Sequence, residues 1–161
     1  MPAEVTSIRD GECTIIVDTK HWPVVFATWF GEPTEGAVMR YFAANEALFN
    51  RARKERTRFV LVTDAAFTQR PSPKVRKLIA QQTNAQPADS QELAVGSIII
   101  VESALIRGVV TALTWILPRL KDSRIVGGVD EAIDVALRIL DDQRLARPVS
   151  LSAKTYKRPA A

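Results

Sequence analysis

The sequence predicts an α/β fold with a mixed central sheet, elements in the order ββαβαβαβα and helices mainly on one side of the sheet. Two β-branched runs come first, at residues 13–17 and 23–30. Apolar runs of strand length then alternate with stretches of helical periodicity as far as residue 140. In the most informative stretch, 97–115, an apolar strand passes through a polar turn into a long apolar helix.

The first elements form a predicted hairpin and helix. Residues 1–11 are polar and lack a sustained period, which indicates a flexible N-terminal arm. The runs 13–17 and 23–30 are joined by a polar turn, so we expect them to pair. A break at 31–34 opens a helix, whose apolar residues recur at helical spacing: Val38, Tyr41, Phe42, Leu48, Phe49 and Ala52.

The middle of the chain predicts a buried strand followed by a helix. Residues 59–63 form a continuous apolar run, typical of a central strand covered on both faces, and Asp64 stands at its carboxyl end. A loop is expected over 65–71. Ser72 is the predicted N-cap of a helix with Pro73 at its first position. We expect this helix to reach residue 85 and to resume over 90–93.

The last elements repeat the alternation. A strand is predicted at 95–101, a helix at 104–117, a strand at 124–126 and a helix at 130–140. Asp130 is the expected N-cap of the final helix.

Composition favours one soluble cytoplasmic domain with a short appendage. The chain has 161 residues, of which 47% are hydrophobic. A single cysteine, Cys13, cannot form an intramolecular disulfide, and the start of the chain lacks a signal-peptide pattern. The longest apolar stretch, 109–117, is too short for a transmembrane segment.

The charge divides the chain into three predicted parts. Five of the 22 basic residues and none of the 18 acidic ones lie from Arg144 onward, so the rest of the chain is nearly neutral. The sequence therefore predicts an arm at 1–11, a folded domain at 12–143 and a basic disordered tail at 144–161.

Three stretches carry a resemblance to a known family. The strand Val60-Leu61-Val62-Thr63-Asp64 resembles the one that precedes the phosphorylation loop of anti-sigma-factor antagonists. The segments 103–108, with Thr111, Ala112 and Trp115, and 124–132 resemble bacterial STAS-like and CRAL-TRIO-like proteins. Over residues 12–142 the chain is thus similar to STAS or SpoIIAA-like domains. The resemblance implies a non-enzymatic regulatory or scaffolding role.

The phosphorylation motif of that family is incomplete here. Phosphorylated STAS antagonists carry Asp-Ser-Ser/Thr-Gly at the start of the helix after this strand. Arg70-Pro71-Ser72-Pro73-Lys74 supplies one serine without the acid or the glycine. Ser72 is therefore a candidate phosphoacceptor, but an N-cap role is the favoured interpretation.

No residue pattern predicts catalysis, a cofactor or a metal. Cys13 and His21 are the only residues of their types, and we expect Cys13 in the core and His21 in a solvated turn rather than a catalytic pair. A structural zinc site needs four such ligands. Gly127-Gly128 lacks the lysine and third glycine of a phosphate-binding loop and is read as a turn.

The predicted function is docking of a protein partner through strand-to-helix loops and an exposed helix, since α/β folds place recognition at strand carboxyl ends. The candidate partner-binding residues are Asp64, Thr68, Arg70, Ser72, Lys74, Ser103 and Arg107. Arg107 opposes the helix dipole, so we expect an acidic partner such as Glu102 or Asp64. A homodimer is expected. Contact of the basic tail with nucleic acid or an anionic membrane is the weaker interpretation of its charge.

The alternative function is a carrier or sensor of a lipid or small apolar ligand, drawn from the CRAL-TRIO-like side of the resemblance. Aromatic residues recur around the hairpin and the first helix. A carrier requires free volume between Trp29, Phe42, Phe49 and the helix 105–117, and a tightly packed core there excludes it.

Overall fold

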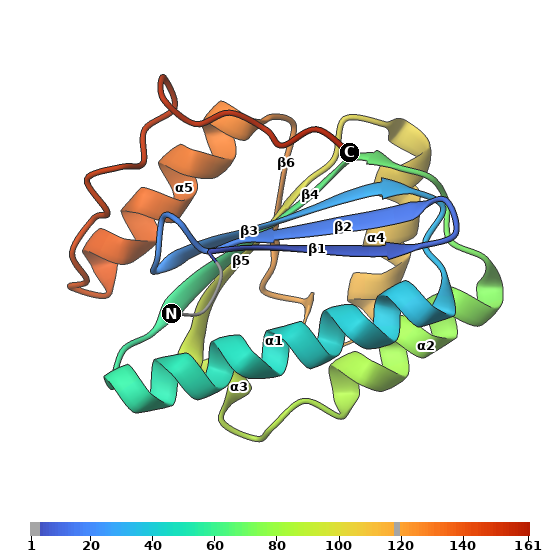
Figure 1. Ribbon diagram of the computed structural model, residues 1–161, viewed down its shortest axis with the longest axis horizontal. Coiled ribbons are helices and arrows are strands. Elements are labelled where there is room, and N and C mark those ends of the chain that lie inside the picture. Colours follow the sequence, from blue (N-terminus) through green and yellow to red (C-terminus); the bar gives the residue numbers. More distant parts are fainter. Residues whose placement is uncertain (1–3, 118–119) are drawn as a thin grey trace.

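The protein is built around one mixed β-sheet. The structure is a computed structural model that describes residues 4–117 and 120–161. Within these residues the sheet has six strands in the order β1-β2-β3-β4-β5-β6 (Figure 1). Strand β2 pairs antiparallel with both β1 and β3, and β3 to β6 run parallel to one another. The predicted α/β class with a mixed sheet is confirmed.

The predicted hairpin is present, and an additional strand precedes it. Strands β2 (Cys13–Asp18) and β3 (Val24–Gly31) pair antiparallel, as expected. The flexible arm expected at 1–11 is wrong for its second half, because β1 (Val5–Asp10) pairs along the whole of β2. Ile8 is the buried apolar residue of β1. One inward apolar side chain in six residues does not give the alternating pattern that predicts a strand.

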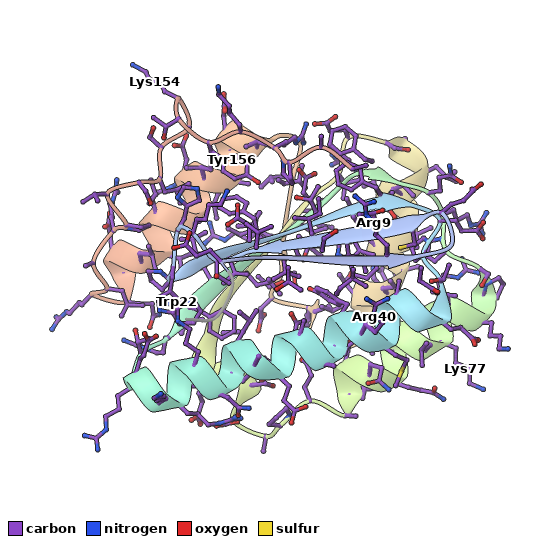
Figure 2. All side chains as sticks on the ribbon, in the orientation of Figure 1. Arg9, Trp22, Arg40, Lys77, Lys154 and Tyr156 are labelled. Carbon is purple, nitrogen blue, oxygen red and sulfur yellow. The ribbon has the colours of Figure 1, made fainter. Side chains whose placement is uncertain are left out.

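Helix α1 (Glu35–Glu55) covers one face of the hairpin. Its N-cap is Thr34, whose hydroxyl accepts a hydrogen bond from the Ala37 N–H at 3.2 Å. The predicted apolar stripe is buried except for Phe42, which is half-buried. Arg40 of α1 also donates to the carbonyl of Arg9 in β1 at 2.8 Å, which ties the helix to the edge strand (Figure 2).

Strand β4 (Phe59–Thr68) is longer than the sequence predicts. The strand was expected to stop at Thr63 with a loop from 65, but it continues through the charged Asp64 for four more residues. Asp64 has no exposed surface and pairs with Arg158, so its charge does not end the strand. Phe67 stacks on Phe30 of β3 with ring centroids 5.3 Å apart and extends the pairing further.

The elements after β4 follow the prediction closely. Ser72 caps α2 (Pro73–Asn84) by accepting from the Val75 N–H at 3.2 Å, and α3 (Ser90–Leu93) is the expected second segment. Then come β5 (Ala94–Ile100), α4 (Ala104–Ile116), β6 (Arg124–Val126) and α5 (Val129–Asp142). The N-cap of α5 is Gly128, so the expectation for Asp130 is wrong. Asp130 lies instead in the first turn, where a carboxylate favours the helix dipole.

The helices lie mainly on one side of the sheet, as predicted. Helices α1, α2, α3 and α4 lie against one face, whereas α5 lies against the other (Figure 1). Successive side chains of β4 alternate between the two layers: Leu61 faces α1 and Val62 faces α5. The carboxyl ends of the parallel strands meet near the start of α4.

The chain beyond α5 forms a strap across the α5 side of the sheet, where the sequence predicts disorder. Leu151 and Tyr156 are buried there, and Tyr156 stacks on Phe26 of β3 with ring centroids 4.2 Å apart (Figure 2). Arg158 anchors the end of the strap to Asp64. The tail is polar and contains prolines, so its composition predicts disorder even though these two side chains are buried.

Candidate functional site: an apolar cavity between the sheet and helices α1, α2 and α4

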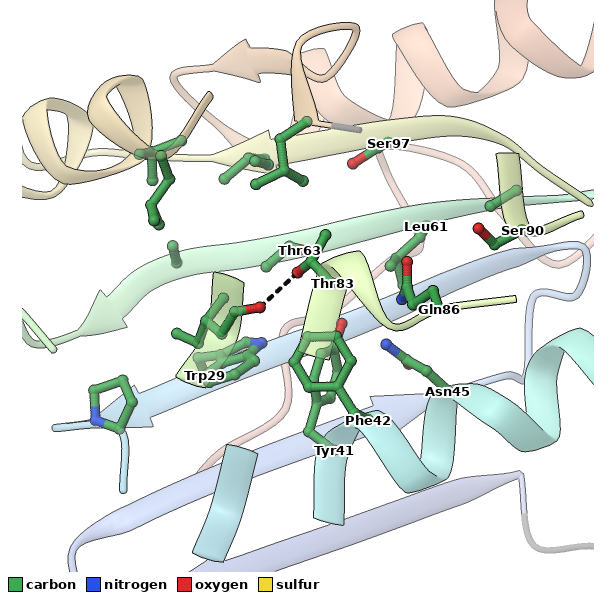
Figure 3. A pocket seen from close by; sticks show the side chains of 18 of the residues that line it. Trp29, Tyr41, Phe42, Asn45, Leu61, Thr63, Thr83, Gln86, Ser90 and Ser97 are labelled. Atoms are coloured by element: carbon green, nitrogen blue, oxygen red, sulfur yellow. Dashed lines mark hydrogen bonds between the residues drawn. The ribbon is translucent and has the colours of Figure 1, made fainter. Parts of the chain in front are cut away.

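An apolar cavity of about 260 Å³ lies between the sheet and the helices on its α1 side (Figure 3). Its floor includes Trp29 of β3, Leu61 and Thr63 of β4 and Ile99 of β5. Helix α1 forms one wall, α2 and α3 a second and α4 a third, as shown by Phe42, Ile79, Gln91 and Val110. The cavity therefore lies between the sheet and the inner sides of these helices.

Small side chains on the sheet leave this space. Where the floor passes beneath α4 and α3, it carries Thr63, Ala65 and Ser97 rather than large residues. Interiors are normally packed so densely that voids larger than a water molecule are few. The space is partly open to solvent, and its volume and lining make it a candidate ligand site.

Helix α4 is the loosest wall of the cavity. Among its side chains that the structure describes, only Ile106 is buried. Ile106, Val110 and Leu113 face the cavity, while Leu105 and Trp115 are 60% and 85% exposed. A helix that is apolar on its inner side and exposes large apolar residues on its outer side is held by few contacts.

An aromatic wall closes the α1 side. The rings of Trp29 and Tyr41 meet edge to face with centroids 4.8 Å apart, and Tyr41 meets Phe42 at 5.4 Å. Burial raises the pKa of Tyr41, and hydrogen bonds with the side chains of Asn45 and Thr63 oppose that rise. The Tyr41 hydroxyl therefore stays protonated and paired inside the wall.

Two polar atoms in the same wall have no partner among the described residues: Trp29 Nε1 and Asn45 Oδ1. Both side chains line the cavity, and Figure 3 shows the nitrogen end of the Asn45 amide directed towards Tyr41, with which Asn45 shares a hydrogen bond. An unsatisfied buried polar group costs about 1–3 kcal/mol, so each of the two atoms is an unusual feature of this wall.

The cavity wall is uncharged throughout its described residues, which include no Asp, Glu, Lys, Arg or His. In residues 4–117 and 120–161 there is also no cluster of three side chains able to hold a metal ion. The described lining is therefore suited to an uncharged, largely apolar molecule.

Asp64, the first predicted partner-binding residue, is not exposed. Arg158 of the strap reaches its carboxylate at 2.7 Å and also Glu102 at 2.8 Å. The two acids expected to pair with Arg107 are thus engaged by Arg158, and Arg107 instead donates to the carbonyl of Val101 at 3.3 Å. The predicted acidic partner of Arg107 is therefore wrong. The arginine that binds these two acids is Arg158, which lies in the tail that the sequence predicts to be disordered.

The other predicted residues divide into structural and exposed ones. Thr68 lines the cavity rim and donates to the Gly31 carbonyl at 3.2 Å, while Ser72 and Ser103 accept N-cap hydrogen bonds. Arg70 is exposed, and Lys74 is 82% exposed despite its ion pair with Glu35. Of the seven residues, Asp64 is the buried one, and the other six remain candidates for a partner surface.

Cys13 and His21 do not meet. Cys13 is buried in the cluster under α1, where burial raises the pKa of its thiol. His21 hydrogen-bonds Ser150 through Nδ1 at 2.8 Å and packs edge-on against Tyr156 of the strap. The solvated turn expected for His21 is therefore partly covered by the strap.

The sequence interpretation missed Asn45 and Arg158. Asn45 had a detectable signal, because it follows Tyr41 by four residues and so lies on the predicted buried face of α1. A polar residue at such a position deserves a functional hypothesis. Arg158 gave no comparable signal, since its role depends on a contact with a residue 94 positions away.

Comparison with known proteins gives likenesses in structure alone. No family model matches the chain, and no curated protein matches it. Among solved structures it is similar to an uncharacterised protein of the DUF3478 family with a SpoIIAA-like fold from Shewanella loihica PV-4. The sequence identity is 12%, the TM-score is 0.49, and the match covers 82% of this chain and 91% of that one.

Proposed function

We propose that the protein is a non-enzymatic binding module that carries or senses a small apolar ligand in the cavity between the sheet and α1, α2 and α4. The observation that supports this proposal is an uncharged, aromatic-lined space of about 260 Å³. For comparison, an apolar cavity of about 150 Å³ admits benzene. The space required by the carrier interpretation, between Trp29, Phe42, Phe49 and α4, is present.

Binding in this cavity is driven by removal of apolar surface from water. Each Å² of apolar surface that a ligand buries contributes about 25 cal/mol, less the cost of holding the ligand in place. We expect α4 to move outward to admit the ligand, because Ile106 is the one buried side chain among those described in this helix. No helix in the described part of the chain is long and apolar enough to span a membrane.

The test is calorimetric titration of the full chain with naphthalene, a rigid apolar probe larger than benzene. We expect saturable binding at one site per chain. The variant Val110→Trp places an indole in the cavity and should abolish binding, since Val110 is part of the wall. The matched control Ala112→Trp adds the same side chain to the exposed side of α4 and should bind as the wild type does.

The pair of variants separates site-specific binding from general adsorption to apolar surface. Equal binding by the wild type and by Val110→Trp contradicts the proposal, as does the absence of binding to the wild type. A cooperative thermal unfolding transition in Val110→Trp shows that this variant still folds, so its loss of binding is not a loss of the fold.

A second candidate function is docking of a protein partner, favoured by the exposed side of α4. Trp115 is 85% exposed and Leu105 is 60% exposed, with the exposed Arg107 between them in the sequence. Self-association through this side gives the expected homodimer. Sedimentation equilibrium tests it: a mass of twice 17.8 kDa that falls to one chain in Trp115→Ser supports docking between copies. A monomer at all concentrations contradicts the homodimer.

A further inference from the structure

The end of the strap contacts the start of α4, the cavity wall that has one buried side chain among those described (Figure 1). We propose that Arg158 is a latch that holds α4 against the sheet and thereby sets how fast a ligand enters and leaves the cavity. This inference rests on the proposed function. It adds to that function a regulatory residue that lies outside the cavity wall.

Arg158 joins the sheet to α4 through one guanidinium group. Its Nε lies 2.7 Å from Oδ2 of Asp64 in β4, and its Nη2 lies 2.8 Å from Oε1 of Glu102. Glu102 directly precedes Ser103, the N-cap of α4. The group therefore connects a carboxylate on a central strand to the residue before the helix.

The two halves of this connection differ in strength. The Asp64 side chain is 1% exposed, whereas that of Glu102 is 45% exposed. The Arg158 guanidinium also lies over the Phe67 ring, and Tyr156 is stacked on Phe26, so the end of the strap is held on the sheet independently of α4. Outward movement of α4 thus breaks the pair with Glu102 and leaves the pair with Asp64 in place.

The start of α4 has few contacts besides this pair. Ile106 packs in a small cluster with Ala65, Ile99 and Val101 of the neighbouring strands and their ends. Arg107 donates to the carbonyl of Val101 at 3.3 Å. Because Ile106 is itself part of the cavity wall, the helix end that Glu102 holds is the end that must move for the wall to open there.

The latch affects the rates of binding rather than the affinity. The closed position of α4 contains the pair of Arg158 and Glu102 with or without a ligand beneath the helix, whereas the open position lacks it. Loss of the pair therefore favours opening equally in both forms, and it raises the association and dissociation rates by the same factor. For an ion pair of this exposure, that factor is about two- to fivefold.

Hydrogen exchange of the full chain measures the latch without a ligand. Glu102→Gln removes the charge beside α4 and keeps the pair of Arg158 with Asp64. We expect it to speed exchange of the hydrogen-bonded amides at the start of α4, from Arg107 onward, by about two- to fivefold. The matched control is Glu55→Gln in α1, which removes a pair with Arg51 at a carboxylate of nearly the same exposure, 44%. It should leave exchange in α4 unchanged.

A second variant excludes an effect of the Glu102 charge on the helix dipole alone. Arg158→Lys keeps a positive charge for Asp64 but lacks the planar group that bridges both carboxylates. If the latch acts through Arg158, adding Glu102→Gln to Arg158→Lys produces no further increase in α4 exchange. The Tyr156 amide, which donates to the Ser152 carbonyl at 3.0 Å, gives a readout that needs only Glu102→Gln. Loss of the latch speeds its exchange as well, since coupling is reciprocal, whereas a dipole effect leaves it unchanged.

Stopped-flow mixing with naphthalene then measures the two binding rates. We expect both rates to rise by the same factor in Glu102→Gln, at unchanged affinity. Unchanged exchange in α4, full additivity of the two substitutions, or naphthalene binding at unchanged rates overturns the latch and leaves the proposed function standing. Failure of naphthalene to bind the wild type overturns the proposed function and with it the control of ligand entry, while the exchange data show separately whether Arg158 holds α4.

Discussion

Asp64 is an acidic residue on a central strand, and Arg158, near the end of the chain, forms an ion pair with it. The residue has no exposed surface, and Arg158 contacts both its carboxylate and that of Glu102. The guanidinium also lies over the Phe67 ring, 5.0 Å from its centroid. This arrangement holds the strap in place and removes Asp64 from the set of residues available to a partner.

Removing Arg158 should therefore destabilise the fold. We expect Arg158→Ala to lower the free energy of unfolding by about 2–3 kcal/mol, somewhat below the roughly 3–5 kcal/mol of a fully buried pair, because a quarter of the Arg158 side chain is exposed. Urea unfolding measures it. Arg147→Ala is the control in the same strap: its pair with Asp141 is half exposed on both sides, so the substitution should change the free energy of unfolding much less. Equal effects of the two substitutions contradict the anchoring role.

The two tyrosines make stability depend on alkaline pH. Burial raises the pKa of Tyr156, and the nearby carboxylates of Asp64 and Asp18 raise it further; burial also raises the pKa of Tyr41. Since the folded-state pKa values lie above the unfolded value of about 10, stability is constant below that pH and declines as pH rises above it.

Ultraviolet titration of tyrosine ionisation measures this effect. We expect no ionisation of either tyrosine in the native protein near pH 10, and joint ionisation with unfolding at higher pH. Tyr156→Phe should flatten the decline of unfolding free energy with pH. A tyrosine that ionises near pH 10 in the native protein contradicts the described burial.

At the scale of elements, the helices differ in how firmly they are held. Helix α5 buries Ala132, Ile133, Val135, Ala136 and Leu140 against the sheet. Helix α4 has one buried described side chain, Ile106, and lies over the cavity. The difference makes α4 the moving part of the proposed binding site.

Amide hydrogen exchange followed by mass spectrometry tests this difference. We expect the α4 amides to exchange faster than those of α1 and α5, because local opening of α4 breaks few packed contacts. Saturation with naphthalene should slow exchange in α4 and leave α5 unchanged. Protection of α4 equal to that of α5, without ligand, contradicts a movable wall.

The sequence predicts most elements well where a local signal exists. The hairpin, α2 with its Ser72 cap and the short α3 all carry such signals and lie where expected. The prediction is wrong where a partner remote in sequence decides the outcome. Strand β1 is defined by pairing with β2, and β4 passes through Asp64 because Arg158 reaches it.

At the scale of the whole molecule, the two layers that cover the sheet differ in how tightly they are packed. On the α5 side, helix and strap form a closed core around Phe26 and Tyr156. On the α1 side, small residues of β4 and β5 and the shallow seat of α4 leave the cavity. Its aromatic lining could be anticipated from the sequence, but its volume could not, because that depends on where α4 rests.

The measurement that tests the central claim most directly is solvent extraction of the protein purified gently from its own cells, followed by mass analysis of the released compounds. Wild type and Ala112→Trp should release the same uncharged apolar compound at about one equivalent per chain, and Val110→Trp should release none. A wild-type protein that releases nothing above background, or equal release from Val110→Trp, would contradict a ligand-binding cavity.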